Sequence, residues 1–101
     1  MLGPSMAQPL PHDVETDLGQ LVPLLAEFGY APVSCLSSES FGNFRAVFSA
    51  DNNSIAITKD RGQYIVDGSQ SALEPAGLWQ AFSSTVALAE PLRSFLRIRR
   101  A

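Results

Sequence analysis

Hydrophobic and polar side chains alternate along the central stretch of the chain, residues 44–67. Turn-forming residues interrupt the alternation twice, with Asp-Asn-Asn-Ser at 51–54 and Asp-Arg-Gly at 60–62. A period of two is typical of a strand with one buried face. Three runs show this period: residues 44–49, 55–59 and 64–67. The pattern therefore predicts an antiparallel meander of strands joined by two tight turns.

The spacing of the two turns predicts which residues face each other across the strands. If residues 52–53 form the first turn, Phe48 lies opposite Ile57. If residues 61–62 form the second turn, Ile57 lies opposite Val66. The same parity also contains Phe44, Ile55 and Tyr64. We assign this apolar face of the sheet to the core.

The opposite parity gives the sheet a second, mixed face. This face has a small apolar centre at Val47 and Ile65 and charged residues at its edges. A small sheet that helices cover on one side leaves its other face to water or to a partner. The predicted residues of this open face are Arg45, Val47, Ser49, Ala56, Thr58, Gln63, Ile65 and Asp67.

Helical periodicity precedes the central strands. Apolar residues recur at steps of three and four over residues 13–28, as in an amphipathic helix. Pro23 interrupts this pattern, because proline lacks the backbone N–H and crowds the residue four positions before it, Gly19. We expect either a kink at Pro23 or a helix whose stable part begins near Gln20, with Gly29 at its end.

The remaining elements have weaker signals. Residues 33–36 predict a strand at the sheet edge or beside the first hairpin, followed by a polar, serine-rich segment. After the sheet, Ser71 and Glu74 have the spacing of a capping box, and Glu90-Pro91 resembles a helix start. These signals favour one or two helices over about residues 74–97, with an apolar patch that we expect in the core: Leu78, Trp79 and Phe82.

Together these elements predict an α+β fold. Its centre is an antiparallel meander sheet of three to four strands, covered on one face by an N-terminal helix and one or two C-terminal helices. We expect a single domain over residues 13–101. Residues 1–12 are interpreted as a remnant of cloning followed by a mobile, proline-bearing tail.

Composition supports one folded domain with a modest core. The chain has 101 residues, of which 46% are hydrophobic and 17% are charged. It contains no apolar run of the length that a membrane span needs, and no signal peptide is apparent. The single cysteine, Cys35, excludes an internal disulfide and is expected to be a small buried hydrophobic residue. We therefore expect a cytoplasmic protein that does not bind membranes.

The distribution of charge is more informative than the net charge of −3. No lysine or arginine precedes Arg45, whereas arginines cluster at the C-terminus. One interpretation is a solvated acidic helix face with a basic helix end that suits the helix dipole. The other is an acidic surface that attracts a basic partner. We do not expect nucleic-acid binding, because the basic cluster is short, terminal and without interleaved glycine and aromatic residues.

Candidate chemistry is sparse. His12 is the only histidine, and nothing in the sequence holds it beside a nucleophile or an orienting acid. One histidine and one cysteine cannot form the usual Cys/His zinc site, and no glycine-rich phosphate loop is present. We therefore expect a protein that is not an enzyme and has no metal or cofactor.

Two features allow both a structural and a functional interpretation. At the second turn, Gly62 suits the positive φ of a type I turn with a bulge. Asp60 and Arg61 then either cap the turn and face solvent or form a charged tip that inserts into a partner's cleft. Trp79 is expected in the core, with an exposed interface anchor as the alternative.

The order of the elements and several short motifs resemble small bacterial immunity proteins encoded beside polymorphic toxins. The motifs are Leu-Leu-Ala-Glu-Phe-Gly-Tyr at 24–30, Phe-Gly-Asn-Phe at 41–44 and Ile-Ala-Ile-Thr-Lys-Asp-Arg-Gly-Gln-Tyr at 55–64, and the resemblance extends over about residues 13–96. It implies a protein that binds one toxin tightly and blocks its active site.

If this resemblance holds, the partner is a cognate toxin or effector, and inhibition is steric and electrostatic. We expect the chain to be a monomer or a weak homodimer. A secretion chaperone or adaptor that holds an effector segment is the alternative, followed by self-association through the strand that contains Cys35. The expected partner-binding residues are Arg45, Val47, Thr58, Ile65 and Asp67 on the open face and Asp60 and Arg61 at the tip.

Overall fold

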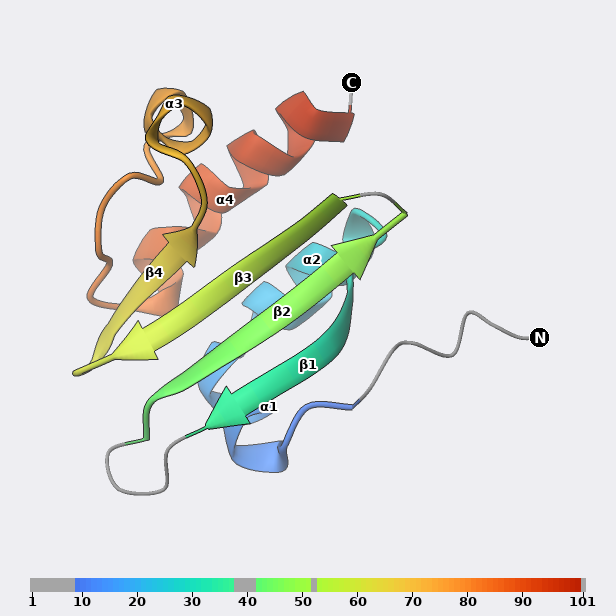
Figure 1. Ribbon diagram of the computed structural model, residues 1–101, viewed down its shortest axis with the longest axis vertical. Helices are drawn as coiled ribbons and strands as arrows, with labels where there is room; N and C mark the ends of the chain where they lie inside the picture. Colours follow the sequence, from blue (N-terminus) through green and yellow to red (C-terminus); the bar gives the residue numbers. More distant parts are fainter. Residues whose placement is uncertain (1–8, 38–41, 52, 101) are drawn as a thin grey trace.

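The computed structural model describes residues 9–37, 42–51 and 53–100 (Figure 1). Predictions for residues 1–8, 38–41 and 52, which include the cloning remnant, most of the tail and parts of two turns, lie outside the described residues. The first helix begins at His12, one residue before the predicted start of the domain.

A four-stranded antiparallel sheet forms the centre of the fold, and its spatial order follows the chain, β1-β2-β3-β4. Figure 1 shows α1, α2 and α4 behind the sheet, and none of the described helices lies over its other face. The predicted α+β meander is therefore confirmed. The strands are β1 (Ala31–Ser37), β2 (Phe44–Ala50), β3 (Asn53–Asp60) and β4 (Gln63–Asp67).

The core lies between the covered face of the sheet and the helices. Strands β2, β3 and β4 contribute their predicted apolar face, and α1, α2 and α4 contribute buried leucines. The described residues contain no buried polar or charged residue in this layer. Burying apolar side chains in this way is the main favourable term in folding. The largest fully buried side chains are Phe48, Leu18, Leu21, Leu25, Ile57, Leu73, Leu78, Leu88, Leu92 and Leu96.

The register of the first hairpin differs from the predicted one by two residues. Phe48 lies opposite Ile55, not Ile57, because the pair that closes the hairpin is Ala50–Asn53. A slip of two residues leaves every side chain on its predicted face, since the strand period is two. The register of the second hairpin, with Ile57 opposite Val66, is confirmed.

The second hairpin closes with a two-residue turn between the Asp60–Gln63 pair. The positive φ predicted at Gly62 is confirmed, at 81°, but Arg61 also has a positive φ of 54°. Two consecutive positive φ values are typical of a type I′ turn, which matches the twist of a hairpin better than type I does. The predicted type I turn with a bulge is therefore wrong.

The N-terminal helix is divided in two, α1 (His12–Leu18) and α2 (Leu21–Glu27). The break is at Gly19, whose φ is 53°, and Pro23 does not kink a continuous helix. Pro23 occupies the first turn of α2, where a backbone N–H has no partner within the helix and its loss costs little. The alternative in which the stable helix begins near Gln20 is closer to the structure.

Strand β1 lies at the edge of the sheet and begins two residues before the predicted strand at Val33. It includes Pro32, which an edge strand tolerates because the missing N–H removes no central ladder bond. The pairing with β2 shifts register between Pro32 and Ser34. At the opposite edge, Tyr64 and Phe82 exchange two backbone hydrogen bonds of 2.8 Å, so an isolated bridge lies along β4.

The C-terminal region forms a short helix α3 (Gln70–Leu73), a 3-10 turn η1 (Glu74–Ala76) and one long helix α4 (Thr85–Arg100). The predicted capping box is wrong, because α3 begins before Ser71 and has no side-chain cap. The predicted helix start at Pro91 is also wrong, since Pro91 lies inside α4.

Helix α4 instead begins after Ser84, whose Oγ accepts a hydrogen bond of 3.1 Å from the N–H of Ala87. This is an ordinary N-cap, which satisfies one of the free donors of the first turn. Pro91 removes one backbone donor, but the helix continues because Leu88 and Leu92 are fully buried on its inner face.

Trp79 is not in the core: its exposed fraction is 49%. Its neighbours Leu78 and Phe82 are buried as predicted. The prediction for Trp79 assumed helical spacing, but residues 77–84 form a loop with no helical period. Leu78 and Phe82 turn inward from this loop, and Trp79 points to the surface.

The cap of α4 gives a prediction about stability. Ser84→Ala removes the hydrogen bond to the N–H of Ala87, and we expect the free energy of unfolding to fall by about 1 kcal/mol. Ser83→Ala is the matched control, because Ser83 is exposed and precedes the cap. Urea denaturation of the two variants checks the prediction, and equal midpoints would contradict it.

Candidate functional site

The open face of the sheet presents side chains from all four strands. Two adjacent cross-strand rows form its middle. The first contains Leu36, Arg45, Thr58 and Ile65, and the second contains Ser34, Val47, Ala56 and Asp67. All five predicted residues of this face therefore lie together on it.

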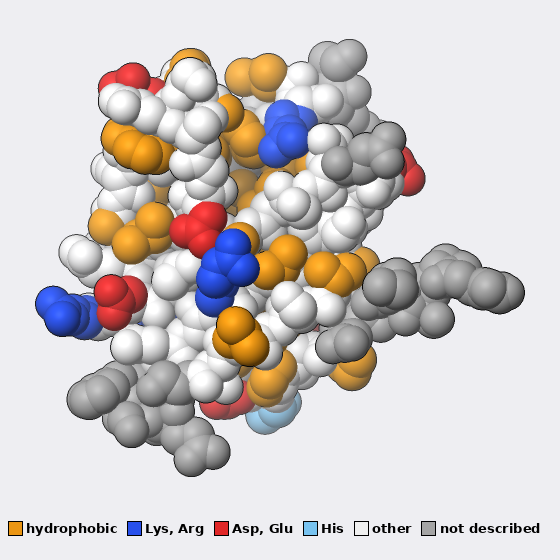
Figure 2. Space-filling view, in the orientation of Figure 1, with side chains coloured by type: hydrophobic (Ala, Val, Ile, Leu, Met, Phe, Trp, Pro, Cys, Tyr) orange, Lys and Arg blue, Asp and Glu red, His pale blue; other side chains and the backbone are white. Residues whose placement is uncertain are grey.

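Charged groups meet in the middle of the open face (Figure 2). Arg45 Nε donates a hydrogen bond of 2.9 Å to Asp67 Oδ2, and Thr58 Oγ1 donates one of 3.3 Å to the same oxygen. This cluster connects β2, β3 and β4. Arg45 belongs to the first row and Asp67 to the second, so their ion pair crosses β3 diagonally beside Ala56. Ala56 belongs to the open face but is only 6% exposed.

The ion pair contributes little to stability. The side chains of Arg45 and Asp67 are 50% and 38% exposed, and exposed pairs are worth at most about 1 kcal/mol. Its main effect is to order both side chains. The charges also lie next to each other, so the centre of the face is polar but has no net charge.

Hydrophobic side chains surround this pair without forming one continuous patch (Figure 2). Leu36 is the most exposed of them, at 73%, while Val47 and Ile65 are half-buried. Leu36 lies in the predicted strand at residues 33–36 but is not among the predicted site residues. The period of two assigns it to the open face once β1 is known to pair with β2.

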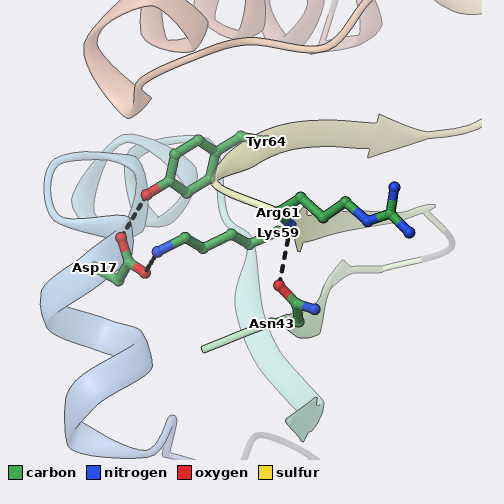
Figure 3. Close-up of polar contacts among 5 residues, drawn as sticks. All are labelled: Asp17, Asn43, Lys59, Arg61 and Tyr64. Carbon is green, nitrogen blue, oxygen red and sulfur yellow. Dashed lines mark hydrogen bonds and ion pairs between the residues drawn. The ribbon is translucent and has the colours of Figure 1, made fainter. Parts of the chain in front are cut away.

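The tip of the β3–β4 hairpin lies at one end of the open face. Asp60 shares the parity of Thr58, and Arg61 follows it in the turn. Both residues are exposed, and the N–H of Arg61 donates a hydrogen bond of 3.1 Å to Oδ1 of Asn43 (Figure 3). This bond joins the tip to the residue before β2, and no pattern in the sequence indicated this role of Asn43.

The backbone of Arg61 is strained. A left-handed conformation costs an L-residue other than glycine, asparagine or aspartate about 1–2 kcal/mol. The other hairpin has Asp51 at the position with positive φ, 52°, and aspartate tolerates this conformation. Backbone conformation at position 61 therefore favours glycine, asparagine or aspartate, and not the arginine that is present.

A second polar cluster lies on the covered side of the sheet, where α1 approaches the strands (Figure 3). The carboxylate of Asp17 accepts hydrogen bonds of 2.5 Å from Lys59 Nζ and from the Tyr64 hydroxyl. Lys59 Nζ also lies 5.5 Å from the centre of the Tyr64 ring. This cluster was not predicted from the sequence, although Lys59 shares the buried parity of Ile55 and Ile57.

The three groups of this cluster shift one another's pKa. Burial alone raises the pKa of Asp17, but the hydrogen bonds from Lys59 and Tyr64 and the charge of Lys59 outweigh it, so the pKa is lowered. The hydrogen bond to Asp17 raises the pKa of Lys59. Burial, followed by the hydrogen bond to Asp17, raises the pKa of Tyr64. The cluster is thus a locked carboxylate–ammonium pair with a neutral phenol, which stabilises the fold and leaves no free base.

Other candidate groups do not form a reactive site. Burial, with a smaller effect from the charge of Asp13, raises the pKa of the Cys35 thiol and disfavours the thiolate. Cys35 is only partly buried, on the covered side of β1, and His12 is exposed at the start of α1. Within the described ranges, no three His, Cys, Asp or Glu side chains are placed to hold a metal ion. None of the described helices is long and apolar enough to span a membrane.

The Asp17 cluster gives a prediction with a pH dependence. Asp17→Asn removes the ion pair, and we expect the free energy of unfolding at pH 7 to fall by about 1–3 kcal/mol. Because the folded pKa of Asp17 is lowered, its stabilisation is present above the unfolded value of 3.8 and is lost as pH falls through the folded pKa. The difference between wild type and variant should therefore shrink below pH 4.

Urea denaturation between pH 2.5 and 7 measures this difference. Glu15→Gln is the matched control, since Glu15 is an exposed carboxylate on the same helix. A loss for Asp17→Asn no larger than for Glu15→Gln, or a difference independent of pH, would contradict the prediction. Lys59 and Tyr64 have raised pKa values, so their contribution to the free energy of unfolding is present at neutral pH. This contribution is lost only above about pH 10, where the two groups lose their protons.

Comparison with known proteins identifies no relative of this chain: no family model, no curated protein and no solved structure matches it. The interpretation of the open face therefore depends on its own residues and geometry.

Proposed function

We propose that the chain is an immunity protein that neutralises a cognate toxin by covering the toxin's active site with the open sheet face and the β3–β4 tip. The observation that carries the proposal is the uncovered face itself. The described helices lie on only one side of the sheet, and the other side presents side chains from four strands (Figures 1 and 2). The toxin as partner follows from the sequence resemblance to immunity proteins.

The open face has features that favour protein binding. Leu36 and Ile65 can be buried against a partner, and the central pair of Arg45 and Asp67 is already ordered by the sheet. Side chains that are fixed before binding lose less entropy in a complex. A rigid sheet also keeps the backbone unchanged on binding, which is common in pre-organised complexes.

The size of the face favours an interface that includes the tip. Strands about 4.8 Å apart that rise about 3.3 Å per residue give the sheet a face of about 20 by 20 Å, or about 400 Å². A stable complex buries about 800 Å² on each partner. We therefore expect the interface to extend beyond the sheet and to include the adjoining exposed tip at Asp60 and Arg61.

Charge favours a partner with a basic surface. The chain carries a net charge of −3, so long-range attraction accelerates its association with a basic protein. The centre of the open face adds little to this attraction, because Arg45 and Asp67 neutralise each other. In this mechanism the total charge sets the association rate, and the apolar side chains of the face set the dissociation rate.

A secretion chaperone is the second candidate, and a specific groove favours it. This groove, of about 420 Å³, lies between the α3–η1 segment and the end of α4. Ile98, which is 68% exposed, lies on it. A chaperone that holds an extended effector segment here would use the groove and not the sheet face. The groove is lined by Ala72, Pro75, Ala76, Phe95, Ile98 and Arg99.

The experiment that tests the proposal begins with capture of a partner from a lysate of the organism that encodes the chain, identified by mass spectrometry. The captured protein is then expressed alone and with the chain. Growth inhibition that the chain reverses supports immunity. A captured protein without toxicity, or toxicity that the chain does not relieve, overturns it.

Surface variants distinguish the two candidates. We expect Leu36→Glu and Ile65→Glu to weaken binding of the captured partner at least about 10-fold, because each places an unpaired charge inside the interface. Val86→Glu is the matched control, since Val86 is 68% exposed on α4 and Leu36 is 73% exposed. Isothermal titration calorimetry measures the affinities. Loss of binding with Ile98→Glu but not with Leu36→Glu would favour the chaperone.

A further inference from the structure

Arg61 combines a strained backbone with a side chain that has no partner, and no other described lysine or arginine has both properties. Its backbone has a φ of 54° in a two-residue turn, where the chain uses aspartate, Asp51, at the other hairpin. Asn-Gly and Asp-Gly are the preferred sequences for such turns, and Arg-Gly is not among them. A strained residue that persists at a surface turn indicates a function for its side chain.

The side chain of Arg61 is also unpaired. Arg45 and Lys59 are bound to aspartates, and Arg93 lies within 3.6 Å of a glutamate. Arg99 donates a hydrogen bond to Asn53. Over residues 9–37, 42–51 and 53–99, the only guanidinium groups without a hydrogen bond or an ion pair are those of Arg61 and Arg97.

The turn holds Arg61 in a fixed position. Asn43 Oδ1 accepts the N–H of Arg61, and in Figure 3 the guanidinium extends away from this bond and from the Asp17 cluster. A hollow of about 490 Å³ adjoins the turn, lined by Asn43, Asp60, Arg61 and Gly62. A second hollow on the open face shares Asn43 and Asp60 with it. The tip therefore projects between two recesses that a partner's surface can fill.

We propose that Arg61 is the anchor of the interface and that its guanidinium enters an acidic pocket of the toxin, where it binds a carboxylate. This inference depends on the proposed function, and it identifies the chemistry of the partner's surface. Guanidinium binds carboxylate through two parallel hydrogen bonds, and arginine is enriched among residues that dominate interfaces. A toxin that is basic overall can carry such a pocket at its active site.

A protein carboxylate fits this tip better than the phosphates of a nucleic acid. Asp60 is exposed directly beside Arg61, and the chain has a net charge of −3, so a polyanion is repelled. In a protein pocket, hydrogen-bond donors can face Asp60 while a carboxylate faces Arg61. The pair of opposite charges then also fixes the orientation of the complex.

The first test separates binding from folding. Arg61→Asn replaces the strained residue by one that the turn prefers, so we expect the melting temperature to rise. The purified toxin domain identified by the capture experiment is the probe, and we expect its affinity for this variant to fall at least about 30-fold. Arg97→Asn is the matched control, because Arg97 is exposed and equally unpaired on α4. Its affinity should stay within about 2-fold of wild type.

The second test identifies the group that Arg61 meets. Arg61→Lys places an amine at the tip, and a carbodiimide joins an amine to a carboxylate only when the two are in contact. We expect a cross-link between this variant and an aspartate or glutamate of the toxin domain, located by mass spectrometry. Wild type and Arg97→Lys should give no such cross-link. Lysine is a point charge without the planar fork, so affinity should fall about 10-fold.

The outcomes distinguish this inference from the proposed function. If the toxin binds Arg61→Asn as tightly as wild type, or if Arg97→Asn weakens binding equally, the anchor role of Arg61 is wrong while immunity stands. If Arg61→Lys forms no cross-link to an aspartate or glutamate of the toxin, the proposal of an acidic pocket is wrong. If no toxin is captured, the proposed function fails, and the inference fails with it.

Discussion

The pairing of β2 with β3 is the constraint on which the other features depend. It places Ala46 opposite Ile57 and Phe48 opposite Ile55, and all four side chains are buried. Because the side-chain period is two, this pairing also determines the opposite face, where Arg45 lies opposite Thr58. A slip by one residue would move the apolar set into water and the charged set into the core. The same hydrophobic effect that stabilises the sheet thus gives the open face its composition.

The helices are attached to this sheet in two different ways. Most of the layer is apolar and depends on the inner stripes of α2 and α4, where Leu25 and Leu92 are fully buried. Helix α1 adds a polar attachment, in which one carboxylate binds an ammonium group and a phenol on two different strands. Apolar packing is tolerant of small shifts, whereas hydrogen bonds of this kind have a preferred geometry. The Asp17 cluster therefore fixes where α1 lies over the end of the sheet.

The sequence predicted the features that depend on period and missed those that depend on tertiary contacts. The alternation assigned every central residue to its correct face, although the first hairpin was shifted, because parity is unaffected by a slip of two. The pattern failed at Trp79, where the chain is a loop, and at Pro91, where burial of Leu88 and Leu92 keeps the helix continuous. It could not predict the partners of Asp17 or the role of Asn43, since these contacts join residues that are far apart in the chain.

The bridge between Tyr64 and Phe82 also affects how the sheet can meet other chains. A free strand edge is a template to which any extended segment can add, and this is a common route to aggregation. Here the loop after η1 returns to occupy backbone groups at the outer edge of β4. At the other edge, Pro32 offers no N–H, and the register shift bends β1. Both features hinder the addition of another strand to the sheet. Contact with another protein is then made through side chains, which discriminate between partners better than backbone groups do.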